Sequence, residues 1–182
     1  MIIGITGKSS SGKSTIASLL SRIQDIKLIT SYTTRPKREG EVDGSDYHFV
    51  DETEFFNGRK ILLTYISDND WFYGVSLKEV QEALDKDEDI IIVVNPKGAK
   101  ELKDRYGSKA FIINLEANDK IRLMRSIQRD EYSKPYEICR RFIKDEQLFN
   151  EVNFPTDLRL DTSYTKESVI INVIKKTIFE EA

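Results

Sequence analysis

The sequence predicts an α/β fold with a mostly parallel sheet flanked by helices. Short β-branched runs alternate along the chain with segments in which apolar residues recur every three or four positions. Such alternation is typical of parallel strands joined by helical crossovers. The strongest strand signal, 89–94 (DIIIVV), is a nearly continuous apolar run, as expected for a strand covered on both faces. A chain of 182 residues is long enough for one domain with a substantial core, so we expect a single domain over 1–182.

The same two patterns, β-branched runs and apolar residues that recur every three or four positions, predict the individual strands and helices. We expect five strands: 2–6, 26–30, 89–94, 110–115 and 158–160. Three helices are indicated by apolar residues that share one face: Ile16, Leu19, Leu20 and Ile23 in the first, Val80, Ala83 and Leu84 in the second, and Val169, Ile170, Val173, Ile174 and Ile178 in the last. The second helix begins after Ser76, whose spacing to Glu79 is that of a capping box.

Two stretches break the alternation. Residues 32–75 hold turns, charges and aromatics, which indicates an inserted subdomain. Residues 118–151 are charged and helical, with a break near 133–135, and seven Lys and Arg against three Asp and Glu fall within 120–141. We therefore expect a core of 1–31, 76–117 and 152–182, an insert over 32–75, and a helical lid over 118–151.

Composition excludes several classes of protein. With 39% hydrophobic residues and a net charge of −3, the chain is typical of a globular protein and not of a disordered one. The pI near 5.4 argues against a surface that binds nucleic acid throughout. One cysteine, Cys139, excludes an internal disulfide and a cysteine-based zinc site. No run approaches the ~20 apolar residues of a membrane span. The apolar start is too short for a secretory signal, so we expect a cytoplasmic protein without a membrane partner.

Residues 7–14 (GKSSSGKS) match the phosphate-binding pattern G-x-x-x-x-G-K-[ST] without a mismatch. The segment lies between an apolar strand and an amphipathic helix, where backbone N–H groups and the helix N-terminus attract phosphates. Lys13 would reach the β- and γ-phosphates, and the Ser14 hydroxyl would ligate Mg²⁺. The sequence thus predicts a P-loop NTPase core that binds ATP through these residues: Gly7, Ser10, Ser11, Gly12, Lys13, Ser14 and Thr15.

A second segment suits another phosphate group. Residues 31–50 (SYTTRPKREGEVDGSDYHFV) hold three cations within four positions, Arg35, Lys37 and Arg38, together with hydroxyls and tyrosines. Guanidinium groups bind phosphate oxygens in pairs, and phenols donate to them. A solvated turn with incidental charge would also account for this composition.

The two segments together resemble the guanylate kinase family, whose T-T-R-x-P-R-x-G-E-x-[DN]-G-x-D-Y-x-F motif is followed almost residue for residue. One fixed position differs, because Pro36 falls one residue early and Lys37 takes its usual place. The resemblance covers nearly the whole chain. Residues 71–76 (WFYGVS) are similar to N-x-Y-G-T-S, 96–99 (PKGA) to x-Q-G-A, and 140–142 (RRF) to K-R-L, whereas 161–163 match the family's loop near the adenine only loosely.

The resemblance implies direct phosphoryl transfer from Mg²⁺-bound ATP to GMP or dGMP, with the insert binding the acceptor and the lid closing over both nucleotides. It implies that the acceptor phosphate is held by Ser31, Arg35, Arg38, Tyr47 and Tyr73. It implies that charge on the transferred group is neutralised by Lys13, Arg125, Arg129 and Arg141. Arg140 competes with Arg141, because the spacing from Arg129 is one residue longer than the family's. The partners would be nucleotides, not nucleic acid, and the chain a monomer or homodimer.

The positions that read the base depart from the family. Thr64 aligns with the guanine-binding glutamate, Val75 with a Ser or Thr, and Val93 and Asn95 with two aspartates. Asn95 could still bind the acceptor or a metal-bound water. Either guanine is contacted by other side chains, with Asp68, Asn69, Asp70 and Trp71 as candidates, or the scaffold phosphorylates a different monophosphate. A binding module without catalysis is a third alternative, which the intact phosphate loop disfavours.

Overall fold

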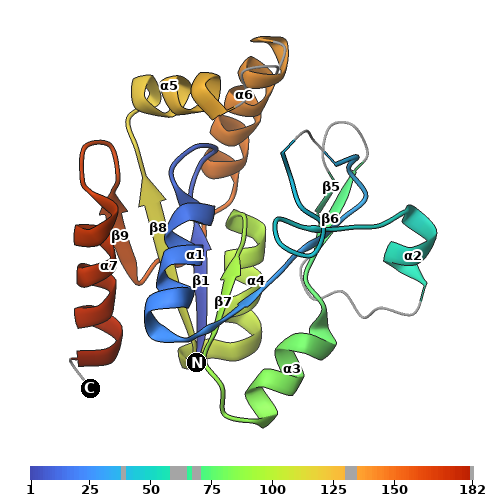
Figure 1. The fold of residues 1–182 in the computed structure, drawn as a ribbon, viewed down its shortest axis with the longest axis vertical. Helices are drawn as coiled ribbons and strands as arrows, with labels where there is room; N and C mark the ends of the chain where they lie inside the picture. Colours follow the sequence, from blue (N-terminus) through green and yellow to red (C-terminus); the bar gives the residue numbers. More distant parts are fainter. Residues whose placement is uncertain (38–39, 58–64, 67–70, 130–134, 181–182) are drawn as a thin grey trace.

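The computed structural model describes residues 1–37, 40–57, 65–66, 71–129 and 135–180 (Figure 1). Its centre is a five-stranded parallel sheet in the order β2-β7-β1-β8-β9. The strands are β1 (Ile2–Thr6), β2 (Lys27–Ile29), β7 (Ile90–Val93), β8 (Ala110–Glu116) and β9 (Leu158–Asp161). The predicted α/β class with a parallel sheet is therefore confirmed, and each expected strand is present within two residues of its expected bounds.

Helices cover both faces of this sheet (Figure 1). They are α1 (Lys13–Gln24), α3 (Leu77–Asp85), α4 (Pro96–Tyr106) and α7 (Glu167–Lys175), with a 3₁₀ turn at Gly107–Lys109 and a π turn at Lys176–Glu180. Two further helices, α5 (Asp119–Arg129) and α6 (Pro135–Glu151), lie above the carboxyl ends of the strands. Of the break predicted near 133–135, Pro135 is the first residue of α6, and residues 133–134 lie outside the described part.

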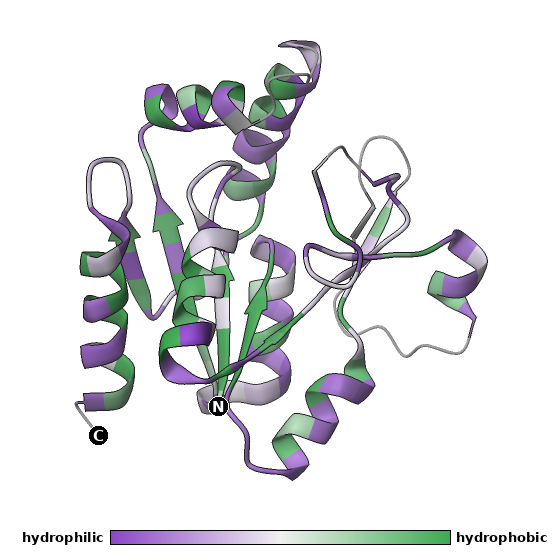
Figure 2. Ribbon diagram, viewed as in Figure 1, coloured by the Kyte–Doolittle hydropathy of each residue, from purple (hydrophilic) through white to green (hydrophobic). Residues whose placement is uncertain are grey.

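Alternate residues of the central strands supply two separate cores, because successive side chains of a strand point to opposite faces. Ile2, Ile90 and Ile112 pack with α3 and α4, whereas Ile3 and Ile91 pack with α1 and α7. All five are fully buried. Figure 2 shows the strands as an apolar layer between helices with polar outer faces. The sheet is thus held from both sides, which fixes the positions of its carboxyl ends.

Helix boundaries and faces match the expectations in part. Ser76 Oγ accepts from the Glu79 amide, so the predicted N-cap of α3 is present. In α1, Ile23 was expected on the buried face but is 54% exposed, because it lies in the last turn, beyond the core. In α7 the buried face is rotated, since Ile171 is buried while Val169 and Val173 are exposed.

Residues 32–74 contribute a second sheet of four short strands in the order β4-β3-β6-β5. These strands are β3 (Tyr32–Thr33), β4 (His48–Phe49), β5 (Tyr65–Ile66) and β6 (Phe72–Gly74), and helix α2 (Glu52–Phe56) lies between β4 and β5. The α2 helix is anchored by Phe55, which is fully buried and packs 5.8 Å from the ring of Phe72. This sheet lies to one side of the main sheet in Figure 1, apart from α5 and α6.

Candidate active site at the phosphate loop

The loop between β1 and α1 has the backbone shape that phosphate binding requires. Gly7 and Gly12 have φ values of 150° and 96°, which favour glycine, and Ser10 is also left-handed with φ 61°. A Cβ on Gly7 would lie 2.3 Å from the Leu115 carbonyl oxygen, so the loop crosses β8 with no room for a side chain. The first residues of α1 then follow directly, because Gly12 is its N-cap.

The start of α1 opens into a cavity of about 320 Å³. Five of the seven residues predicted to bind ATP line it: Ser10, Gly12, Lys13, Ser14 and Thr15. Gly7 and Ser11 do not; Ser11 is fully buried beneath the loop. The unpaired N–H groups and the dipole of a helix N-terminus attract anions, and the first turn of α1 holds no acidic residue that would oppose them.

Lys13 and Ser14 are the first two residues of α1. Lys13 Nζ donates to the Lys8 carbonyl oxygen at 3.0 Å, across the loop. Ser14 is exposed and lines the cavity. The described residues contain no group of three or more His, Cys, Asp or Glu side chains that could hold a metal alone. The single hydroxyl of Ser14 fits Mg²⁺, because this ion keeps several waters and is usually held by one or two protein groups plus substrate phosphates.

Arg125 on α5 lines the same cavity. Its Nη2 donates to the Thr162 carbonyl oxygen at 2.6 Å, and Nη1 lies 3.4 Å from the Ser10 carbonyl oxygen. Thr162, only 5% exposed, places its hydroxyl 2.8 Å from the Ser11 carbonyl oxygen. Helix α5, the loop after β9 and the phosphate loop therefore meet at one point.

The loop after β9 is held by local hydrogen bonds. Ser163 donates its backbone N–H to Asp161 Oδ1 at 2.7 Å, and its Oγ accepts from the Asn118 amide at 2.8 Å. The hydrogen bonds from Ser163 hold the pKa of Asp161 below its usual range. The weak sequence match at 161–163 thus coincides with an ordered turn beside the cavity.

The other predicted lid arginines lie on α5 and α6. Arg129 is the last residue of α5, and its side chain lies outside the described part. Arg141 Nε lies 3.3 Å from the Glu137 carbonyl oxygen, and Arg140 pairs with the Glu137 carboxylate at 3.0 Å. The competition between Arg140 and Arg141 stays open, because both are half-buried on the same helix.

The second sheet carries a buried arginine among aromatic rings. Arg35 is 4% exposed, and its guanidinium lies 5.6 Å from the centre of the Tyr47 ring and 5.5 Å from that of Phe49. It donates to Glu41 Oε1 at 2.7 Å. Burial lowers the pKa of Arg35, but the hydrogen bond to Glu41 and the nearby Tyr73 outweigh burial and raise it above its usual value. The Tyr47 and Tyr73 rings also meet edge to face at 5.8 Å.

The remaining predicted acceptor residues are scattered. Ser31 precedes β3, and its carbonyl oxygen accepts from His48 N at 2.9 Å. Val75 is 2% exposed in the α3–α4 core. Asn95 caps α4 by accepting from Gly98 N at 2.8 Å. Arg38 and Thr64 lie outside the described residues, as do the candidates Asp68, Asn69 and Asp70; Trp71 is half-buried just before β6.

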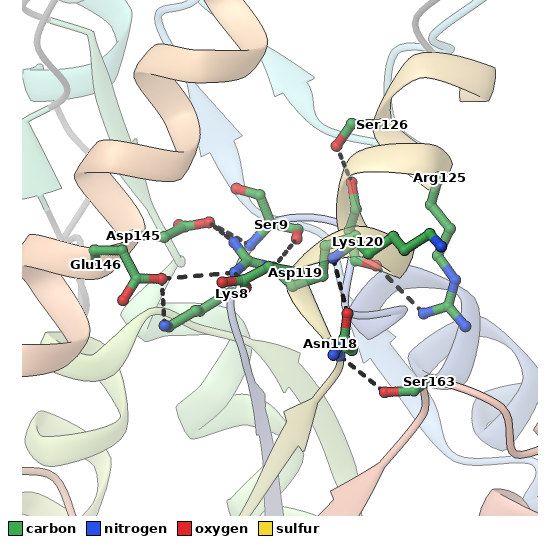
Figure 3. Close-up of polar contacts among 12 residues, drawn as sticks. Lys8, Ser9, Asn118, Asp119, Lys120, Arg125, Ser126, Asp145, Glu146 and Ser163 are labelled. Atoms are coloured by element: carbon green, nitrogen blue, oxygen red, sulfur yellow. Dashed lines mark hydrogen bonds and ion pairs between the residues drawn. The ribbon is translucent and has the colours of Figure 1, made fainter.

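One group of residues beside the loop was not foreseen from the sequence. Arg122 on α5 is fully buried and donates to Asp145 on α6. Asp145 also accepts from the Ser9 amide (Figure 3). A weak signal was available, since Arg122 lies three residues after Asp119 and four before Ser126 on a helix, spacings that put all three on one face.

Comparison with known proteins finds relatives of this chain in one family. The family model described as guanylate kinase matches residues 1–172. A guanylate kinase of Caldanaerobacter subterraneus is 31% identical over 85% of this chain and 74% of its own length. One from Helicobacter hepaticus is 36% identical over 66% of this chain, and one from Deinococcus radiodurans is 30% identical over 79%. The matches cover 63% and 61% of those two relatives, so the chain spans about three fifths of their length.

Solved structures share the fold. The crystal structure of guanylate kinase from Anaplasma phagocytophilum superposes with a TM-score of 0.71 at 21% identity, covering 100% of this chain and 85% of that one. An uncharacterised protein from Eubacterium ventriosum has a TM-score of 0.53 at 14% identity, with 98% of each chain covered. These likenesses support the P-loop NTPase fold. With a family match over 172 of its 182 residues, this chain belongs to the guanylate kinase family.

Proposed function

We propose that this chain transfers the γ-phosphoryl group of ATP to a nucleoside monophosphate, with GMP or dGMP as the favoured acceptor. The observation that carries the proposal is that Arg125 lines the same cavity as Lys13 and Ser14, although more than 110 residues separate them. Phosphoryl transfer requires little covalent chemistry from a protein. It requires cations from several directions around the transferred group and a site from which water is excluded.

In the proposed reaction, an oxygen of the acceptor phosphate attacks the γ-phosphorus, and the bond to the β–γ bridging oxygen breaks as ADP leaves. No catalytic base is needed, because the acceptor phosphate is already anionic near neutral pH. Lys13 and Arg125 would neutralise charge on the transferred group, assisted by Arg129 and Arg141. Mg²⁺, held by Ser14 and the phosphates, would supply further charge neutralisation.

The acceptor would bind at the four-stranded sheet. This placement is supported by the buried Arg35, because the ion pair with Glu41 fixes its guanidinium near the Tyr47 and Phe49 rings. An arginine held in this way offers a planar donor with little loss of side-chain entropy. We assign residues 32–75 to acceptor binding and 118–151 to the lid, with the remainder as the ATP-binding core.

A second acceptor remains a candidate on a specific observation. Val75 stands where the family has a hydroxyl that touches guanine, and it is buried in the α3–α4 core without a polar group. A site that lacks a hydrogen-bonding partner for a base loses much of its discrimination. The same phosphate contacts would then serve a different nucleoside monophosphate.

The test is a coupled ADP-release assay with Mg·ATP and a panel of GMP, dGMP, AMP, CMP, UMP and dTMP. Lys13→Ala and Arg35→Ala should each lose most activity and remain folded, while Lys100→Ala on α4, an exposed residue that does not line the cavity, serves as the matched control. Turnover confined to GMP and dGMP supports the proposal, and turnover on another member identifies the alternative acceptor. Near-normal turnover in either variant refutes the mechanism. Absence of turnover on all six, with ATP still bound, points to a binding module.

A further inference from the structure

The outer turn of the phosphate loop is held by side chains of the lid helices α5 and α6. Asp145 Oδ2 on α6 accepts from Ser9 N at 2.6 Å (Figure 3), and Arg122 Nε on α5 donates to Ser9 O at 2.9 Å. Both polar groups of the Ser9 backbone are therefore engaged by side chains more than 110 residues away. Ser9 does not line the 320 Å³ cavity, but the next residue, Ser10, does.

Arg122 links the two helices to the loop. Its guanidinium is fully buried and donates to Asp145 at 2.8 Å and to Asp119 at 2.7 Å, while Glu146 lies 3.7 Å away. Its face lies 4.3 Å from the centre of the Phe142 ring. Burying an arginine is costly unless its hydrogen bonds are satisfied, so this geometry is strongly determined.

Two further contacts act on the residues beside Ser9. Ser10 Oγ lies 2.7 Å from Ser126 Oγ. Lys8 Nζ pairs with Glu146 (Figure 3). Ser10 holds φ 61°, a left-handed conformation that a non-glycine residue adopts at a cost. The surrounding contacts therefore maintain a loop shape that an isolated loop of this sequence would leave.

We propose that Asp145 and Arg122 are positioning residues, which hold the phosphate loop in its phosphate-binding shape before ATP arrives. Neither residue lines the cavity, so both act through the Ser9 backbone. A loop already ordered gives up less conformational entropy on binding, and so binds ATP more tightly. The expected effect on ATP binding rests on the proposed function. The expected ordering of the loop does not rest on it.

Hydrogen–deuterium exchange of the nucleotide-free protein tests the ordering directly. In Asp145→Ala the peptide covering residues 7–14 should exchange at least about tenfold faster, as expected for loss of a charge-assisted hydrogen bond. In Asp145→Asn the rate should rise by less than in Asp145→Ala, because the amide oxygen can accept both bonds that Oδ2 accepts, although without the charge. Lys100→Ala, which removes an exposed ion pair on α4, is the control. An unchanged rate in Asp145→Ala overturns the proposal.

Steady-state kinetics of the same variants test the consequence. Asp145→Ala should raise KM for ATP about tenfold while KM for the acceptor changes less than about twofold, and Asp145→Asn should restore most of the loss. A purely structural role predicts a lower melting temperature with both KM values unchanged, or changed alike, and would overturn the proposal. If the wild type shows no turnover with any monophosphate, the proposed function fails, and the exchange experiment alone decides the positioning role.

Discussion

Replacing Gly7 by alanine should lower the free energy of unfolding of the nucleotide-free protein by about 4 kcal/mol. The φ of 150° falls where side chains are strained, at a cost of roughly 1–3 kcal/mol. The new Cβ would lie 2.3 Å from the Leu115 carbonyl oxygen and 2.5 Å from Ser11 Oγ. Overpacking of this kind adds roughly 1–3 kcal/mol. The Leu115 oxygen belongs to β8, which pairs with strands on both sides and cannot withdraw.

Gly12→Ala is the matched control, because only one of the two costs applies there. Gly12 has φ 96° but no atom within 4 Å of a built Cβ, so its loss should be about 1–2 kcal/mol. Urea unfolding, followed by circular dichroism without nucleotide, measures both variants against the wild type. Equal losses in the two variants, or a loss below about 1 kcal/mol for Gly7→Ala, would refute the steric argument.

Three further perturbations test other contacts. Thr162→Val removes the hydroxyl from the Ser11 carbonyl oxygen, and urea unfolding should show a loss of about 1–3 kcal/mol; an unchanged midpoint contradicts this. Asn95→Ala removes the N-cap of α4 and should cost about 1 kcal/mol, whereas Asn95→Asp should keep the cap and lose far less. Asp161 has a lowered pKa because of Ser163, so it stabilises the fold above the unfolded pKa, near 4, and this contribution disappears as pH falls through the lower folded pKa. The stability difference between wild type and Asp161→Ala should therefore shrink in acid, and a difference that grows there would exclude this cause.

Local sequence patterns were sufficient to predict the strands of the main sheet. In the central strands the reason is that a parallel strand buried on both faces has a nearly continuous apolar sequence. These patterns did not predict which face of α7 is buried. Six apolar residues occur within 169–174 and 178, and packing against α1 selects Ile170, Ile171 and Ile174. The α4 helix was not anticipated either, although its start carries Asn95 as a cap and Pro96 at the first helical position.

The phosphate loop was predictable because its residues are contiguous and each has a chemical reason for its place. Arg122 and Asp145 were not, because their roles arise only when α5 and α6 meet the loop. In sequence, each is one charged residue among many on an amphipathic helix. Val75 shows what an alignment alone does not reveal. The alignment to the family places Val75 at a position that contacts the base, whereas the structure shows its side chain in the core.

The central place of β1 in the sheet has a consequence for biosynthesis. Ile2 pairs with Ile90 on one side and with Ala110 on the other, so β1 lacks its first neighbour until β7 has left the ribosome and its second until β8 has done so. Sheets with pairings between segments distant in sequence fold slowly, and their apolar strands stay exposed until the partner strands are available. During translation the segment IIGIT is a short, uncharged, β-branched stretch of the kind that pairs between chains. The yield of folded protein should therefore depend on chaperone capacity as well as on the stability of the finished fold.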